Sequence, residues 1–204
     1  MVDIVINENL IKHIDEYDAI IIATNCYQVM RNGFQYEASK VFPYILETNY
    51  ETGYGDITKL GNIVETKEKD GPKFILAFTT FGYNFKGNET DFFDYKSLEK
   101  CLRMINILYR DKHLATTMIG CSEFDGNADK EKILDIINNE VKNFDLTIYD
   151  YKQKSHAEIA IKEYFKSLKK RYERNKEKLK LGRKNKKEVR MQSWNIRHNT
   201  QSCW

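Results

Sequence analysis

Asp125 lies in a glycine-containing stretch, Ile119-Gly-Cys-Ser-Glu-Phe-Asp-Gly126, whose residue types could support hydrolysis. The stretch follows an apolar run and precedes a helical pattern, and its glycines would let backbone N–H groups converge on an anion. A carboxylate beside a bound phosphate is electrostatically unfavourable unless it has a task such as activating a water molecule. The pattern therefore suggests a catalytic Asp125, although on spacing alone a turn-capping aspartate is at least as well supported.

A second loop of this kind is Thr24-Asn-Cys-Tyr-Gln-Val-Met-Arg-Asn-Gly33, which also connects an apolar run to a helical segment. The N-terminus of a helix attracts anions because its free N–H groups and its dipole favour negative charge. Gly33 would allow a ligand to approach the backbone closely. Either loop alone is also compatible with an ordinary strand-to-helix turn. Together, two such loops on neighbouring strands predict a ligand that contains a diphosphate.

The motifs of several enzyme classes are absent from the sequence. There is no GxGxxG, Walker or HExxH motif and the four histidines are scattered, so we expect neither a cofactor nor a metal site. Cys121 and Ser122 have no evident histidine partner, which argues against a covalent hydrolase. The four cysteines lack CxxC spacing and are interpreted as reduced thiols of a cytoplasmic protein. No signal peptide or membrane-spanning run is evident, so we expect no membrane association.

Hydrophobic residues make up 41% of the 204 residues, and their spacing predicts strands alternating with helices. Strands are predicted at residues 3–6, 19–23, 61–66, 74–79, 114–119 and 146–149. Helices are predicted at residues 10–17, 33–42, 95–110 and 129–141. This alternation favours an α/β fold with a largely parallel sheet covered on both sides. Ligands of such sheets bind at the carboxyl ends of the strands, here loops 24–32, 80–91 and 120–127.

The net charge of +3 conceals a strong asymmetry along the chain. Residues 152–204 carry a net charge of +12, whereas residues 1–151 carry −9, and we place a domain boundary between them. The basic extension begins with helical spacing over residues 157–172, and its composition predicts disorder from about residue 181. Its interleaved aromatic residues could bind RNA or other nucleic acid. A helix packed on the body, or self-association through opposite charges, are the alternatives.

The order of these loops and strands over residues 3–150 resembles the macro domain, the ADP-ribose-binding fold. Phe78-Thr-Thr-Phe-Gly82 looks like the FTSSFG-type strand end of the ADP-ribose 1''-phosphate phosphatases. Thr117-Met-Ile-Gly-Cys-Ser-Glu-Phe-Asp-Gly126 is similar to the P-x-I-G-x-G loop of the family. The similarity is closest to the branch that holds these phosphatases and the terminal ADP-ribose protein glycohydrolases. It implies a three-layer α/β/α domain with a mixed, largely parallel sheet, followed here by a basic C-terminal helical extension.

The resemblance also implies which residues contact the ligand. Glu8 or Asn9 would read adenine, and Asn25 and Cys26 would lie near the distal ribose, Asn25 being a second catalytic candidate. The first loop would contact the diphosphate through Gly33, Phe34 and Gln35. The third loop would embrace it from the other side through Gly120, Cys121, Ser122, Glu123 and Phe124.

Three further positions bear on the chemistry. Asp125 matches the catalytic aspartate of the glycohydrolase branch, allowing for one inserted residue. Thr80, a candidate ligand contact, stands about where that branch carries a nucleophilic lysine, so we expect no lysyl–ADP-ribose intermediate. Arg31 replaces a small residue of the family's glycine-rich run and could contact phosphate through its guanidinium.

The leading hypothesis is a hydrolase of ADP-ribose derivatives. Its substrate would be ADP-ribose 1''-phosphate or ADP-ribose attached to protein, and Asp125 would activate the attacking water. The diphosphate loops would supply most of the rate enhancement by positioning. The alternative is a module that binds ADP-ribose or a related nucleotide without turnover, with a basic tail that binds nucleic acid.

Overall fold

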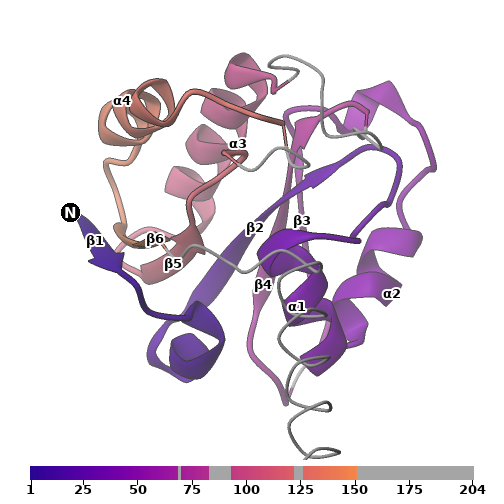
Figure 1. Ribbon diagram of the computed structural model, residues 1–204, viewed down its shortest axis with the longest axis horizontal. Coiled ribbons are helices and arrows are strands. Elements are labelled where there is room, and N and C mark those ends of the chain that lie inside the picture. The colour runs from indigo at the N-terminus through magenta and orange to yellow at the C-terminus, as the bar shows by residue number, and fades with distance from the viewer. Residues whose placement is uncertain (69, 83–92, 122–125, 151–204) are drawn as a thin grey trace, which may run out of the picture. The chain divides into compact units, whose positions relative to one another are not determined.

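The computed structural model describes residues 1–68, 70–82, 93–121 and 126–150 (Figure 1). These described residues contain a six-stranded sheet in the order β1-β6-β5-β2-β4-β3. The strands are β1 (Val2–Ile6), β2 (Ala19–Asn25), β3 (Ile63–Glu65), β4 (Phe74–Thr80), β5 (His113–Thr117) and β6 (Asp145–Asp150). Only β3 pairs antiparallel, with β4, and the other neighbouring strands are parallel. The predicted mixed, largely parallel sheet is confirmed, whereas the predicted extension at 152–204 lies outside the described residues.

Four α-helices and two 3₁₀ helices accompany the sheet in the described part of the chain. They are η1 (Leu10–Glu16), α1 (Gly33–Val41), α2 (Tyr44–Tyr50), η2 (Ile57–Lys59), α3 (Tyr95–Leu108) and α4 (Lys130–Glu140). The segment predicted as a helix at 10–17 is a 3₁₀ helix, and α3 ends two residues earlier than predicted. Helix α2 was not predicted: Pro43 follows α1, but it also occupies the N-cap position of α2, where its missing N–H costs nothing.

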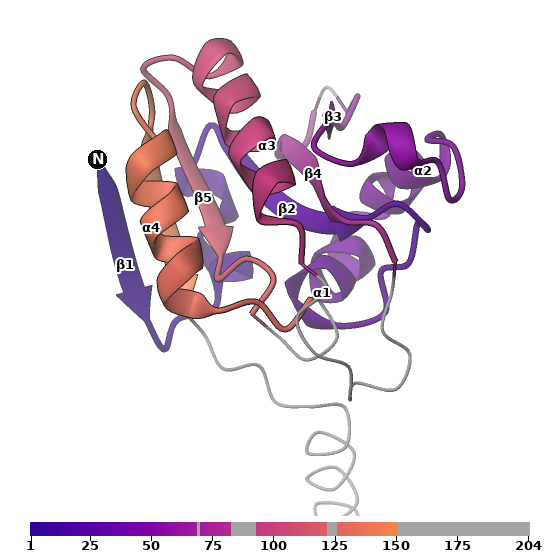
Figure 2. The same ribbon diagram turned by 90° about the horizontal axis from the view of Figure 1, so that it is seen from above.

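The helices cover both faces of the sheet, which makes three layers (Figure 2). Ile20 and Ile22 of β2 pack in one cluster with η1, α1 and α2, and Ile21 between them packs in the other cluster with α3 and α4. All three side chains are at most 2% exposed. The continuous apolar run therefore reflects a strand buried on both faces, as a covered parallel sheet requires. No helix in the described residues is long and apolar enough to cross a membrane.

Buried ionisable groups in these two clusters make the stability of the fold decrease at alkaline pH. Burial raises the pKa of the Cys101 thiol from 9.0 to about 12, and its Sγ donates a hydrogen bond to the Asn62 carbonyl at 3.4 Å. Burial also raises the pKa of the Tyr109 and Tyr149 phenols. Each group keeps its proton in the folded state after the unfolded chain has lost it. Their contribution is therefore complete below about pH 9 and is lost as the pH rises further.

We expect the free energy of unfolding, measured by urea denaturation, to fall steadily above pH 9. Cys101 alone should account for about 1.4 kcal/mol per pH unit between its unfolded and folded pKa. The variant Cys101→Ala should lose stability below pH 9 because of its cavity, and this deficit should shrink above pH 9 because its alkaline slope is shallower. An unfolding free energy that stays constant up to the pKa of free tyrosine would contradict this assignment.

Candidate functional site

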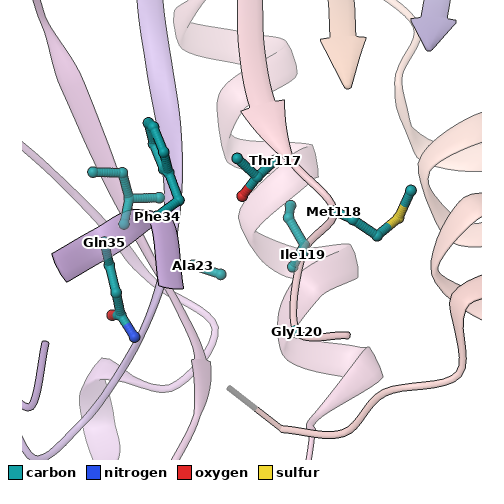
Figure 3. A pocket seen from close by; sticks show the side chains of 8 residues that line it. Ala23, Phe34, Gln35, Thr117, Met118, Ile119 and Gly120 are labelled. Atoms are coloured by element: carbon teal, nitrogen blue, oxygen red, sulfur yellow. The ribbon is translucent and has the colours of Figure 1, made fainter. Parts of the chain in front are cut away.

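A narrow cleft lies at the carboxyl ends of β2 and β5 (Figure 3). It encloses about 20 Å³ and is lined by residues 22–23 of β2, 34–35 of α1 and 117–120 at the end of β5. Thr117, Ile119 and Gly120 lie on one side of the cleft, Phe34 and Gln35 lie on the other, and Ala23 lies between them. The two loops predicted to hold one diphosphate therefore face each other across the end of β2.

The α1 side of the cleft is formed by the beginning of a nine-residue helix. Gly33 is its first residue and has φ = +66°, a left-handed conformation that glycine adopts without steric cost. Phe34 and Gln35 follow and are 6% and 5% exposed, and Phe34 anchors the helix in the core cluster with α2. The positive end of the helix dipole lies at this first turn, so this end of α1 favours an anion.

The opposite side of the cleft packs against the aromatic ring of Phe93, a residue that the sequence analysis did not single out. Gly120 has φ = +67°, and a Cβ atom built on it would lie 2.3 Å from the Phe93 ring. A Cβ atom on Gly126 would lie 3.0 Å from Phe93. The Ala128 N–H donates to the Gly120 carbonyl at 2.9 Å, which closes the loop. Phe93 precedes the N-cap residue of α3 in sequence, and no local pattern distinguishes it from another buried aromatic residue.

The Asn25 side chain shapes the loop that follows β2. It is 3% exposed, its Nδ2 donates to the Val29 carbonyl at 2.7 Å, and its Oδ1 accepts from the Tyr27 and Val29 N–H groups at 3.0 and 3.2 Å. These bonds fold residues 25–29 into a compact turn. The Asn25 side chain therefore stabilises the turn that follows β2. The predicted catalytic role of Asn25 stays a prediction.

Cys26 and Thr80 tie the same loop to the end of β4. The Cys26 N–H lies 3.1 Å from the Thr80 carbonyl and 3.2 Å from the Phe81 carbonyl and donates to both. The Cys26 side chain is fully buried, and this burial raises the pKa of its thiol. The Thr80 Oγ1 donates to the Thr24 carbonyl at 3.4 Å, and Thr80 is 4% exposed. Both side chains belong to the interior, and neither lines the described cleft.

Glu8 and Asn9 lie at the end of β1 and do not line the cleft. The Asn9 Oδ1 accepts from the Ile11 N–H at 3.0 Å and caps η1. The Glu8 Oε2 lies 3.0 Å from His13 Nε2, while His13 Nδ1 lies 2.8 Å from Glu16 Oε1. Their predicted contact with adenine stays a prediction.

Arg31 and Cys121 flank the cleft in sequence on its two sides. Arg31 is exposed, two residues before the start of α1, and forms no ion pair with any described residue. Cys121 is half-buried and its Sγ donates to the Ile119 carbonyl at 3.3 Å.

Among the described residues, no cluster of histidine, cysteine, aspartate or glutamate side chains could hold a metal. Four predicted site residues lie outside the described residues: Ser122, Glu123, Phe124 and Asp125.

The close contact between Gly120 and Phe93 makes residue 120 intolerant of a side chain. We expect Gly120→Ala to lower the free energy of unfolding by about 2 kcal/mol or more, because the added Cβ meets the ring in a strained backbone conformation. Gly82→Ala is the matched control, since its Cβ would have no neighbour within 4 Å. Chemical denaturation of both variants tests the contact, and equal stabilities would rule it out.

Comparison with known proteins places this arrangement in a known fold. No family model matches the chain, and no curated protein matches it either. Among solved structures, the macrodomain of Mycobacterium tuberculosis DarG is similar with a TM-score of 0.52 at 19% identity, covering 73% of this chain and 97% of that one. A Bacteroides thetaiotaomicron protein gives a TM-score of 0.57 at 16% identity, covering 74% and 99%.

A third structure, Thermosipho africanus DarTG in complex with ADP-ribose, gives a TM-score of 0.55 at 12% identity and covers 74% of this chain and 43% of that one. The likeness to macrodomains thus spans nearly the whole of the DarG domain and about three quarters of this chain. It agrees with the three layers and the mixed, largely parallel sheet. The described residues of this chain have the macrodomain fold.

Proposed function

We propose that the cleft binds ADP-ribose or a derivative of it, with the diphosphate between the first turn of α1 and the Gly120 segment. The observation that carries this proposal is the opposition of these two segments across the end of β2. The positive end of the α1 dipole favours an anion, and Gly33 at the start of the helix permits a close backbone approach. The DarTG structure that shares this fold holds ADP-ribose.

The walls of the cleft belong to the hydrophobic core. Phe34 and Ile119 line the cleft from opposite sides and are 6% and 2% exposed. The proposed diphosphate therefore lies between two segments that core packing holds in place.

Arg31 supplies a cation next to the proposed diphosphate. We expect calorimetric titration of the full chain with ADP-ribose to show micromolar binding that weakens with added salt. Arg31→Ala should reduce the affinity about tenfold, because a charge-assisted hydrogen bond to phosphate is lost. Lys40→Ala is the matched control: it removes the same charge from the last turn of α1, where Lys40 Nζ lies 4.2 Å from the Tyr36 ring centroid.

Two results would count against the binding proposal. Absence of heat and of competition at millimolar ADP-ribose would mean that the cleft has another ligand. Equal losses of affinity in Arg31→Ala and Lys40→Ala would mean that only the overall charge matters, and that Arg31 makes no local contact.

We further propose that the bound ligand is hydrolysed, with Asp125 as the group that accepts a proton from the attacking water. For ADP-ribose 1''-phosphate, water adds at the phosphoryl group, the ester bond breaks, and ADP-ribose and inorganic phosphate leave. For a protein-linked ligand, water instead replaces the carboxylate of the protein at the distal ribose. The resemblance of the 117–126 segment to the family's loop supports this proposal.

The alternative is a module that binds ADP-ribose without turnover and whose basic residues 152–204 bind RNA. Threonine in place of the nucleophilic lysine of the glycohydrolase branch supports it, as does the +12 charge of the extension.

Asp125→Asn separates the two proposals. If the protein is a hydrolase, the unaltered chain should release phosphate from ADP-ribose 1''-phosphate or ADP-ribose from modified protein. Asp125→Asn should then lower turnover at least about a hundredfold, because a general base typically contributes that much, while ADP-ribose affinity is retained. If it is a binding module, neither protein turns over, and RNA retention should fall with salt and disappear when residues 152–204 are removed.

A further inference from the structure

The outer edge of β1 has no strand partner in the described part of the chain. β1 is the terminal strand of the sheet order and pairs with β6 on one side only. Figure 1 and Figure 2 both show β1 at the margin of the sheet. In the strand order β6 separates β1 from β5 and β2, whose ends form the cleft. The other margin is the three-residue β3, so β1, with five residues in continuous register, is the longer open edge.

The hydrogen bonds to β6 show which residues of β1 face outward. The Leu146 N–H donates to the Met1 carbonyl at 2.8 Å, and the Asn7 N–H donates to the Asp150 carbonyl at 3.2 Å. Odd-numbered residues thus point their backbone groups toward β6. Because these groups alternate along a strand, the N–H and C=O groups of Val2, Ile4 and Ile6 point away from the sheet.

The side chains of these outward-facing residues are apolar and accessible. Ile4 is 47% exposed and Ile6 is 65% exposed. Natural proteins protect such edges with lysine, proline or a bulge, and β1 contains none of them. An open apolar edge of this kind is a template for another strand, so it needs a partner.

We propose that the partner is β1 of a second copy, in an antiparallel pair centred on Ile4. In this register Ile4 of one copy lies opposite Ile4 of the other, and Val2 lies opposite Ile6. All of these residues have outward-facing backbone groups, so each pair exchanges two hydrogen bonds and the arrangement closes by two-fold symmetry. The sole charge in the strand, Asp3, lies opposite Val5, so no like charges are opposed.

The same register brings the apolar side chains together on one face. Val2 packs against the core cluster that contains α3 and α4, and side chains alternate along a strand, so Ile4 and Ile6 lie on that face too. A two-fold axis perpendicular to the sheet continues this face from one copy into the other. Ile4 of one copy then covers Ile4 of the other, Ile6 covers Val2, and a continuous sheet runs through the dimer.

The test measures the oligomeric state of the full chain over a range of micromolar concentrations by sedimentation velocity. We expect a dimer that dissociates on dilution. Ile4→Lys places two ammonium groups opposite each other at the axis and should raise the dimer dissociation constant at least about tenfold. Ile107→Lys, on the 77%-exposed Ile107 of α3, is the matched control and should leave the dimer unchanged.

Hydrogen exchange of the full chain supplies a readout that does not depend on a variant. The N–H groups of Val2, Ile4 and Ile6 should exchange slowly at concentrations where the dimer forms and quickly on dilution. A chain that is monomeric at all concentrations overturns the proposal, as does a dimer that Ile4→Lys leaves intact. Slow exchange of these groups in the monomer also overturns it, because another part of the same chain would then cover the edge.

Discussion

The burial of β2 on both of its faces is the constraint on which the rest of the fold depends. β2 pairs with β5 over residues 19–21 and with β4 over residues 20–25, so it has no free edge. Its alternating isoleucines need apolar partners above and below the sheet, and these come from η1, α1 and α2 on one face and α3 and α4 on the other. Parallel neighbours then require crossover connections, and the carboxyl ends of β2, β4 and β5 lie at one end of the sheet.

The two sides of the cleft are held by different means. The β2 side relies on polar bonds within a short segment, in which the Asn25 amide spans residues 25–29. The β5 side relies on steric contact between distant segments, because the Phe93 ring fills the space beside Gly120. The first arrangement fixes the backbone conformation locally. The second joins the loop after β5 to the residue that precedes the N-cap of α3.

The proposed binding and the proposed self-association use different parts of the sheet. The cleft lies at the carboxyl ends of β2 and β5, whereas the open edge belongs to β1, which β6 separates from β5. Pairing of two β1 strands would therefore leave the cleft accessible in both copies. The ends of β2 and β4 are joined by hydrogen bonds, from the Cys26 N–H to the Thr80 and Phe81 carbonyls and from the Thr80 Oγ1 to the Thr24 carbonyl.

The sequence by itself determined most of the element types and the strand ends at which the cleft lies. Apolar runs and helical periods report which local faces must be buried, and this property depends on residues close in sequence. Tertiary structure alone decided the strand order, the position of β1 at the edge, and the packing of Phe93 against Gly120. It also placed the Asn25 side chain at the centre of a hydrogen-bonded turn. These features arise from contacts between residues far apart in sequence, or from competition among several hydrogen-bond acceptors and donors. A local sequence pattern does not specify which strand, side chain or backbone group a residue contacts.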